Sequence, residues 1–358
     1  MSWTKRVSRA FRRLVGLTRG ERARIRHGPR GAVTHVIILD GTMSSLEPGY
    51  ESNAGLTFKL LNACVGAGMS LYYEPGVQWP DWRRTGDVML GRGINRQIRR
   101  AYGYLASRYR PGDRIFLFGF SRGAYAVRSL AGVIDRVGLL RAEHATVRHV
   151  KTAYRHYRNE AGSGAAEAFR RELCHDSAVI EMVGVWDTVK ALDVSGPLIW
   201  RLLTPKNEFH SHALGPHIRH GYHALALDET RAVYAPVMWE TGPGSRGGEG
   251  RVEQVWFRGT HGDVGGQLDG FHAARPLANI PLVWMLERAE EHGLILPEGW
   301  RARYPTDAQA PSIGKWRGWG KIFLFRRARV VGRDPSERLH ESVRGGVEPD
   351  APDAQPAM

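Results

Sequence analysis

Residues 111–134 read PGDRIFLFGFSRGAYAVRSLAGVI, and this stretch decides the fold. The apolar run at 114–118 predicts a buried strand, and the run at 122–133 has the periodicity of a helix. Between them stands Gly119-Phe120-Ser121-Arg122-Gly123. A serine at a strained strand-to-helix turn projects its hydroxyl from the sheet edge, and side chains at the two glycines would collide with neighbouring backbone. The pattern favours Ser121 as a nucleophile over a purely structural turn.

The chain on both sides of this stretch alternates short apolar runs with helical stretches. Strands are predicted at Thr34–Leu39, Ser70–Tyr73, Val179–Trp186 and Val252–Phe257, and helices at Leu56–Ala67 and Ile94–Arg108. Strands that alternate with helices indicate a mainly parallel sheet with helices on both faces. The predicted class is therefore α/β.

The α/β core is expected to span residues 31–343. Within it, residues 141–177 have a helical, Arg/His-rich pattern and residues 195–222 have an irregular one, as expected of insertions that form a lid over a substrate site. Residues 1–30 form a leader. Residues 344–358 form a tail with no apolar face, which predicts disorder.

The leader is strongly basic. Residues 1–30 carry ten Lys and Arg against one acid, and so hold more than half of the net charge of +15. Apolar residues recur at helical spacing opposite the basic ones, which predicts an amphipathic helix suited to an anionic membrane surface. A helix docked on the protein's own body fits the pattern equally well. Beyond the leader no basic-aromatic module such as RNP1 occurs, which disfavours nucleic acid as a partner.

The sequence also bears on the compartment. The leader lacks the apolar core of a secretory signal, and no run of about 18 apolar residues could span a membrane. The two cysteines, Cys64 and Cys174, have no CxxC spacing, which is typical of a reducing compartment. We therefore expect a cytoplasmic protein at the membrane periphery.

His217, His220 and His223 have ligand-like spacing, but no carboxylate or cysteine completes a zinc set, so neither a metal nor a cofactor is expected.

A nucleophilic serine needs a general base and an acid that orients it. In α/β-hydrolases these follow the serine in the order acid, then histidine, each after a strand. Asp187 directly follows the predicted strand 179–186, although Asp is also favoured there as a helix N-cap. His261 follows the strand 252–257 and precedes a glycine-rich loop. His223 is the competing base, and its stretch 222–228 is predicted to be helical.

The oxyanion of an acyl-transfer reaction needs hydrogen-bond donors beside the serine. The Arg122 N–H at the start of the predicted helix is one candidate. The strand 34–39 ends in Asp40-Gly41-Thr42 beside the turn, so the N–H of Gly41 or Thr42 is the other. Asp40 is a candidate to orient this turn or simply to cap it. Asp263 is expected to order the loop after His261.

Seven blocks of sequence together resemble one family. They are LDGT (39–42), YEPGV (73–77), PGDRIFLFGFSRGAYAVRSLAGVI (111–134), GVWDTV (184–189), HALALDETR (223–231), VWFRGTHGDVGG (255–266) and RLHESV (338–343). In this order, over residues 33–343, they are similar to the DUF2235 family of α/β-hydrolases, which includes the Tle1-type phospholipase effectors of bacterial type VI secretion.

The resemblance implies a lipase-like serine esterase that acts on glycerophospholipids, with Ser121, Asp187 and His261 as its triad. It also implies a type VI secretion effector exported into a target cell. The alternative is a non-catalytic, membrane-associated binding protein on a hydrolase scaffold, because a fold does not fix a function. The discriminating feature is whether His261 lies within reach of Ser121 with Asp187 behind it.

Overall fold

The computed structural model describes residues 31–66, 68–76, 92–160, 162–189, 213–242, 250–315 and 325–344. The chain divides into two compact units, Met1–Gly31 and Ala32–Met358. The expected leader, the tail from residue 345 and most of the expected insertion at 195–222 lie outside the described residues. All the described helices and strands belong to the second unit.

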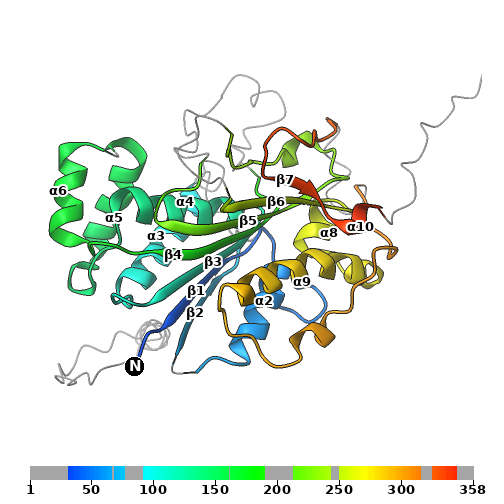
Figure 1. Cartoon of the computed structure of the whole chain (residues 1–358), viewed down its shortest axis with the longest axis horizontal. Coiled ribbons are helices and arrows are strands. Elements are labelled where there is room, and N and C mark those ends of the chain that lie inside the picture. Colours follow the sequence, from blue (N-terminus) through cyan, green and yellow to red (C-terminus); the bar gives the residue numbers. More distant parts are fainter. Residues whose placement is uncertain are drawn as a thin grey trace, which may run out of the picture. The chain divides into compact units, whose positions relative to one another are not determined.

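A seven-stranded sheet in the order β2-β1-β3-β4-β5-β6-β7 forms the centre of this unit (Figure 1). All neighbouring strands pair in parallel, which confirms the predicted α/β class. The strands are β1 (Thr34–Leu39), β2 (Met69–Glu74), β3 (Arg114–Phe120), β4 (Ile180–Trp186), β5 (Ile218–Ala226), β6 (Val252–Phe257) and β7 (Glu337–Leu339). Because all of them run the same way, their carboxyl ends meet at one edge of the sheet.

Helices cover both faces of the sheet. They are α2 (Asn53–Asn62), α3 (Arg92–Ala106), α4 (Arg122–Val137), α5 (Val147–Arg155), α6 (Gly164–Leu173), α8 (His261–Gly265), α9 (Arg275–Glu291) and α10 (Glu341–Arg344). Alternate residues of β1 point to opposite faces: Ile37 and Leu39 join the core under α3 and α4, while Val36 and Ile38 join the core under α2 and α9. Burial on both faces explains why the strands read as continuous apolar runs.

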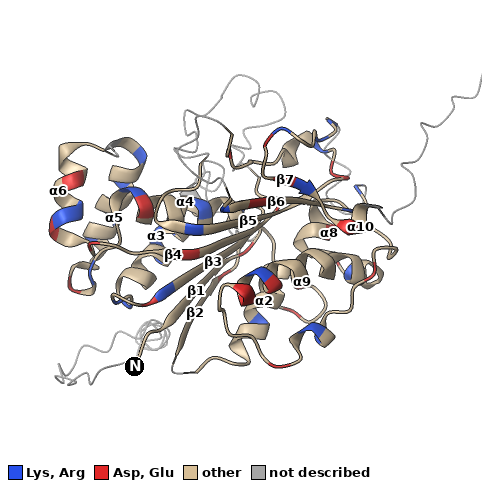
Figure 2. Ribbon diagram, in the orientation of Figure 1, with Lys and Arg blue, Asp and Glu red and all other residues tan. Residues whose placement is uncertain are grey.

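Charged side chains follow this layering. In Figure 2 the middle of the sheet is almost free of Lys, Arg, Asp and Glu, which lie mainly on the helices and at strand ends. The residues described contain no helix long and apolar enough to cross a membrane.

Residues 141–177 contain α5 and α6, as their helical pattern predicted. Both helices pack on the layer formed by α3 and α4, with Val150 and Phe169 in the core that these helices share with the sheet. In Figure 1 they lie at the opposite end of the sheet from α8. The described part of this segment therefore covers α3 and α4.

One secondary-structure prediction was wrong. The stretch 222–228, predicted to be helical, is largely strand: β5 runs from Ile218 to Ala226 between β4 and β6. From Gly221 to Ala226 every residue is buried, so the segment has no polar face. A short apolar run without a polar face cannot be assigned to helix or strand by periodicity alone. The strand β7 lies outside every predicted element.

Candidate functional site

Ser121 stands between β3 and α4, at the carboxyl edge of the sheet. Its backbone has φ 57° and ψ −120°, a strained conformation for a residue other than glycine. Its N–H donates to the Trp186 carbonyl at 3.0 Å, which ties the turn to the end of β4. A Cβ on Gly123 would lie 2.1 Å from the Leu39 oxygen, and one on Gly119 would lie 2.7 Å from the Gly123 oxygen. Both glycines are therefore required for the turn to form.

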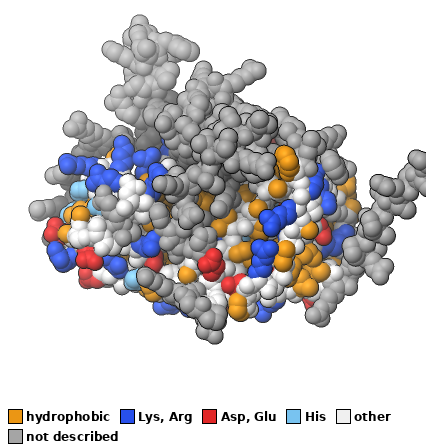
Figure 3. All heavy atoms as spheres, turned by 90° about the horizontal axis from the view of Figure 1, so that it is seen from above, with side chains coloured by type: hydrophobic (Ala, Val, Ile, Leu, Met, Phe, Trp, Pro, Cys, Tyr) orange, Lys and Arg blue, Asp and Glu red, His pale blue; other side chains and the backbone are white. Residues whose placement is uncertain are grey.

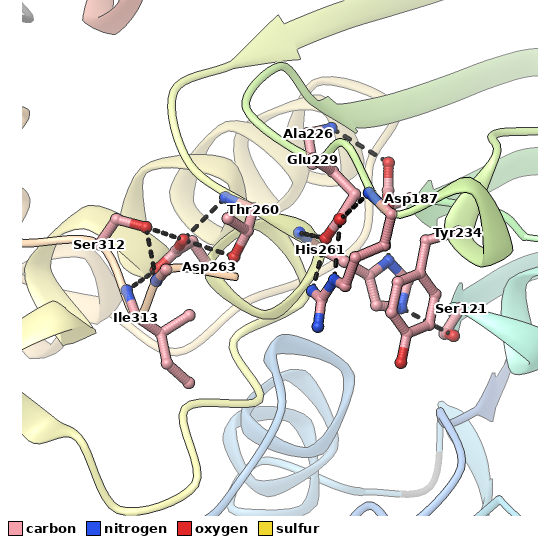
Figure 4. Close-up of polar contacts among 12 residues, drawn as sticks. Ser121, Asp187, Ala226, Glu229, Tyr234, Thr260, His261, Asp263, Ser312 and Ile313 are labelled. Atoms are coloured by element: carbon pink, nitrogen blue, oxygen red, sulfur yellow. Dashed lines mark hydrogen bonds and ion pairs between the residues drawn. The ribbon is translucent and has the colours of Figure 1, made fainter. Parts of the chain in front are cut away.

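Asp187 and His261 lie beside Ser121 at the same edge (Figure 4). Asp187 directly follows β4 and is fully buried, and His261 is the first residue of α8, shortly after β6. The His261 Nε2 lies 2.9 Å from the Ser121 Oγ, and its Nδ1 lies 2.6 Å from the Asp187 Oδ2. The structure thus places serine, imidazole and carboxylate in one hydrogen-bonded row.

The His261 ring is held between two other rings. Tyr234 stacks on it with centroids 4.5 Å apart and planes 13° apart, and Phe120 lies 4.9 Å away. The backbone N–H of His261 also donates to Glu229 Oε2 at 3.2 Å, and the Glu229 carboxylate forms an ion pair with Arg231. Sequence reasoning missed the parts played by Tyr234 and Glu229. In the sequence, only the family-like stretch HALALDETR at 223–231, which contains Glu229, drew attention to this part of the chain.

Asp187 carries a second partner that sequence reasoning missed. The Arg329 guanidinium binds both carboxylate oxygens, and the Ala226 N–H donates to Oδ1 at 3.0 Å. Burial alone would raise the pKa of Asp187, but the charge of Arg329 and the hydrogen bonds from His261 and Arg329 outweigh it and lower that pKa. Asp187 is therefore held as a carboxylate. No periodicity or motif marked Arg329 in the sequence.

The turn after β1 lies against the elbow. The Gly41 N–H donates to the carboxylate of Asp40 at 2.6 Å, so it is not available to an oxyanion, and that expectation for Gly41 was wrong. The Gly41 carbonyl accepts a hydrogen bond from the Ser44 N–H. Because a trans peptide is planar, the Thr42 N–H of the same peptide points in the opposite direction. Among the described residues the Thr42 N–H has no hydrogen-bond partner. The Arg122 N–H, at the first position of α4, has no intrahelical acceptor.

Asp40 is fully buried beneath this turn. Besides Gly41, it accepts hydrogen bonds from the Ser52 hydroxyl at 2.7 Å and the Tyr73 hydroxyl at 2.8 Å. Burial raises the pKa of Asp40, although these hydrogen bonds act in the opposite direction. Its contacts orient the turn through the Gly41 N–H and join it to α2 and β2.

Asp263 ties α8 to a distant loop. It accepts hydrogen bonds from the N–H and hydroxyl of Thr260, and also from the Ser312 hydroxyl and the Ile313 N–H. In Figure 4 it lies on the side of α8 away from Ser121. These contacts order the loop around His261 and leave Asp263 outside the row of reacting groups.

His223, the competing base, has a different environment. It lies in β5, and its Nε2 accepts from the Thr188 N–H while its Nδ1 faces Gln254 Oε1 at 3.4 Å. Burial lowers the pKa of His223 to about 3. One ring nitrogen supports the peptide after Asp187 and the other faces Gln254, so His223 is a structural neighbour of the site.

The other two histidines considered as ligands are also engaged. His217 Nδ1 contacts Asp135 at 2.9 Å, and His220 stacks on His292. The part of the chain that the structure describes contains no group of three or more His, Cys, Asp or Glu residues that could hold a metal ion.

The arrangement is suited to acyl transfer. An imidazole at hydrogen-bond distance from a serine can accept its proton, and a carboxylate behind it stabilises the imidazolium. The backbone N–H groups of Arg122, next to Ser121 in the chain, and of Thr42, in the turn after β1, remain the candidate donors to an oxyanion. All these groups come from turns that follow β1, β3, β4 and β6.

Comparison with known proteins gives a family match. The model of the family described as "T6SS, Phospholipase effector Tle1-like, catalytic domain" matches residues 34–288. A Saccharomyces cerevisiae protein, the uncharacterized protein YEL023C, is 28% identical over 225 residues, which are 56% of this chain and 31% of the yeast protein.

Two solved structures are also similar. The crystal structure of an uncharacterized protein from Pseudomonas aeruginosa has 17% identity and a TM-score of 0.44, with 87% of this chain and 55% of that chain covered. The structure of the Tle1 effector bound to the VgrG spike of the type 6 secretion system has 15% identity and a TM-score of 0.32, with 70% and 55% covered. This chain thus spans about a third of the yeast relative and about half of each solved chain.

The family match covers most of the chain and includes the turns that carry Ser121, Asp187 and His261. The chain therefore belongs to the family of T6SS phospholipase effector Tle1-like catalytic domains.

Proposed function

We propose that the protein is a serine carboxylic-ester hydrolase that cleaves acyl esters of glycerophospholipids. The observation that carries the proposal is the row Ser121–His261–Asp187, with 2.9 Å and 2.6 Å between its reacting atoms. Family membership supports a phospholipid as substrate. A binding protein would have no use for a strained serine in contact with a buried imidazole and carboxylate, which argues against the non-catalytic alternative.

In the first step the Ser121 Oγ attacks the ester carbonyl while His261 Nε2 takes the hydroxyl proton. Asp187 accepts from the other ring nitrogen, which fixes the tautomer and stabilises the imidazolium that forms. Stacking against Tyr234 holds the ring in the plane that both contacts need. The protonated His261 then gives its proton to the departing alcohol, and the acyl group stays on Ser121.

The tetrahedral intermediate carries a negative charge on the former carbonyl oxygen. We assign the N–H groups of Arg122 and Thr42 as its donors, since neither is used elsewhere among the described residues. The positive end of α4 adds to the stabilisation. Asp40 acts as a positioning residue, because its hydrogen bond to Gly41 N–H sets the turn that presents Thr42.

Hydrolysis of the acyl-enzyme repeats these roles with water. His261 takes a proton from the water as it attacks the acyl carbon, and returns it to Ser121 as the C–O bond breaks. Each step uses side chains, backbone amides and water.

The proposal extends to location and partners. On the face seen in Figure 3, Lys and Arg side chains gather at the end that carries α5 and α6, and the exposed basic residues of α5 are Arg148, Lys151 and Arg155. This face and the basic residues 1–30 suit an anionic membrane surface. Export as a type VI secretion effector is supported by the family alone.

The activity is tested with purified protein on phosphatidylcholine and phosphatidylglycerol vesicles, with free fatty acid as the readout. We expect release by the wild type and at least about a 10⁴-fold loss of kcat in Ser121→Ala. Ser107→Ala, the same change at an exposed serine, is the matched control and should keep full activity. Wild-type protein that releases no fatty acid from any lipid would overturn the phospholipase proposal.

The membrane partner is tested separately by flotation with vesicles of increasing phosphatidylglycerol content. Deletion of residues 1–30 should weaken binding to the anionic vesicles, with little effect on hydrolysis of a soluble ester. Unchanged binding would remove the leader as a membrane anchor.

A further inference from the structure

Arg122 has a second feature besides its backbone N–H. It directly follows Ser121, its side chain is half-buried, and its charge acts on Tyr234, the residue that stacks on His261. Burial lowers the pKa of its guanidinium, although Tyr234 acts in the opposite direction. The residue that follows the nucleophile in the chain therefore carries a cation that is partly desolvated.

The guanidinium of Arg122 lacks an acidic partner among the described residues. The two other arginines of the site each bind a carboxylate: Arg231 pairs with Glu229 and Arg329 pairs with Asp187. Arg122 makes neither an ion pair nor a side-chain hydrogen bond within the described part of the chain. A desolvated charge without a partner costs free energy, so the stability of the fold gives no reason for an arginine here.

We propose that Arg122 binds the phosphate of the glycerophospholipid whose acyl ester is held at Ser121. This rests on the proposed function and adds to it a residue that selects phosphate-bearing esters over neutral ones. The guanidinium presents its donors in a planar fork that matches phosphate oxygens. In a glycerophospholipid the acyl esters and the phosphate share one glycerol unit, so a side chain next to the nucleophile is suitably placed to reach the phosphate.

The test compares two short-chain substrates that differ only in the headgroup: dihexanoylphosphatidylcholine below its micelle concentration, and dihexanoylglycerol. In Arg122→Gln the ratio of kcat/KM for the phospholipid to kcat/KM for the diacylglycerol should fall about 10- to 100-fold, as expected for the loss of a charge-assisted contact. Arg301→Gln removes the same charge from an exposed position away from α5 and α6 and should leave the ratio unchanged.

A second arm identifies the source of the phosphate. The dihexyl ether of glycerophosphocholine, which lacks a cleavable ester, should inhibit wild-type hydrolysis of p-nitrophenyl butyrate, and Arg122→Gln should weaken that inhibition about tenfold or more. Inorganic phosphate should inhibit much less. Stronger inhibition by inorganic phosphate than by the ether lipid would mean that Arg122 serves a free anion, which would overturn the proposal.

The outcomes separate this inference from the proposed function. If Arg122→Gln slows both substrates equally, or neither, Arg122 does not select phosphate and the inference fails while the esterase stands. If the wild-type protein hydrolyses no ester and Ser121 does not react with a fluorophosphonate, the proposed function fails first.

Discussion

The Arg329 guanidinium binds both carboxylate oxygens of Asp187, with Nη1 2.5 Å from Oδ1 and Nη2 2.9 Å from Oδ2. The Oδ2 atom also lies 2.6 Å from His261 Nδ1. The same guanidinium donates to the carbonyls of Ala226 and Tyr234. A residue late in the chain thus fixes the carboxylate and joins it to the segment that carries Tyr234. As a consequence, a cation and the His261 ring share one carboxylate oxygen.

We predict that Arg329→Gln moves the acidic limb of the pH profile of kcat/KM to higher pH, by about half a unit to one unit. The reason is that the variant removes the positive charge that most lowers the pKa of Asp187, so the carboxylate behind His261 takes up a proton at higher pH. The profile is measured on a soluble neutral ester, with Arg329→Lys as the variant that keeps the charge and should keep the profile. An equal loss of activity at every pH would indicate a purely structural role.

Acid should destabilise the fold through His223. Its pKa is about 3 in the folded protein and about 6.5 when unfolded, so the unfolded state binds more protons between these values. The contribution of neutral His223 to the free energy of unfolding is therefore fully present above pH 6.5. As the pH drops towards 3, this contribution falls by up to about 1.4 kcal/mol per pH unit.

Urea unfolding at pH 7, 6, 5 and 4 tests this prediction. The free energy of unfolding should fall less steeply between pH 6 and 4 in His223→Gln than in the wild type. Asp187 contributes in the same direction only at lower pH, because its folded-state pKa is lowered and its stabilising effect is lost as the pH falls below its unfolded value. Parallel slopes for the two proteins would contradict the assignment of His223 as a buried neutral histidine.

The elbow should not tolerate a methyl group at Gly123. The added Cβ would lie 2.1 Å from the Leu39 oxygen, so Gly123→Ala should lower the free energy of unfolding by more than about 3 kcal/mol or prevent folding.

Gly103→Ala is the matched control for this substitution. Gly103 lies within α3, and a Cβ there meets only Val150 at 3.7 Å. This change should stabilise the protein by about 0.5–1 kcal/mol through helix propensity. Denaturant unfolding measures both effects, and a folded Gly123→Ala protein of wild-type stability would contradict the described geometry.

Asp40→Asn should reduce kcat by about 10- to 100-fold with a smaller change in KM. The amide replaces an acceptor with a donor among Gly41 N–H, Ser52 and Tyr73, so the turn that presents Thr42 is no longer set. Steady-state kinetics on a soluble ester measure the effect, and circular dichroism checks that the variant is folded. An unchanged kcat in folded protein would show that Asp40 only caps the turn.

Much of the fold could be predicted from the sequence because buried parallel strands are short apolar runs. The strands β1 and β6 were predicted with the bounds that the structure has. The same property concealed β5, because a strand buried on both faces shows no alternation.

The site was only partly predictable. The order of strand ends was enough to select Ser121, Asp187 and His261, which the structure brings together. Two features depend on side-chain orientation and could not be read from residue order. One is the Asp40 carboxylate, which occupies the Gly41 N–H; the other is Arg329, which reaches Asp187 across 142 positions of the sequence.

If Ser121 is the nucleophile, a reagent that reacts with activated serines should form a covalent adduct on it. A fluorophosphonate is incubated with the wild type, Ser121→Ala and Ser107→Ala, and the modified residue is identified by tandem mass spectrometry. One adduct is expected on Ser121 in the wild type and in Ser107→Ala, and none in Ser121→Ala. An adduct on another residue, or labelling that persists in Ser121→Ala, would contradict this expectation.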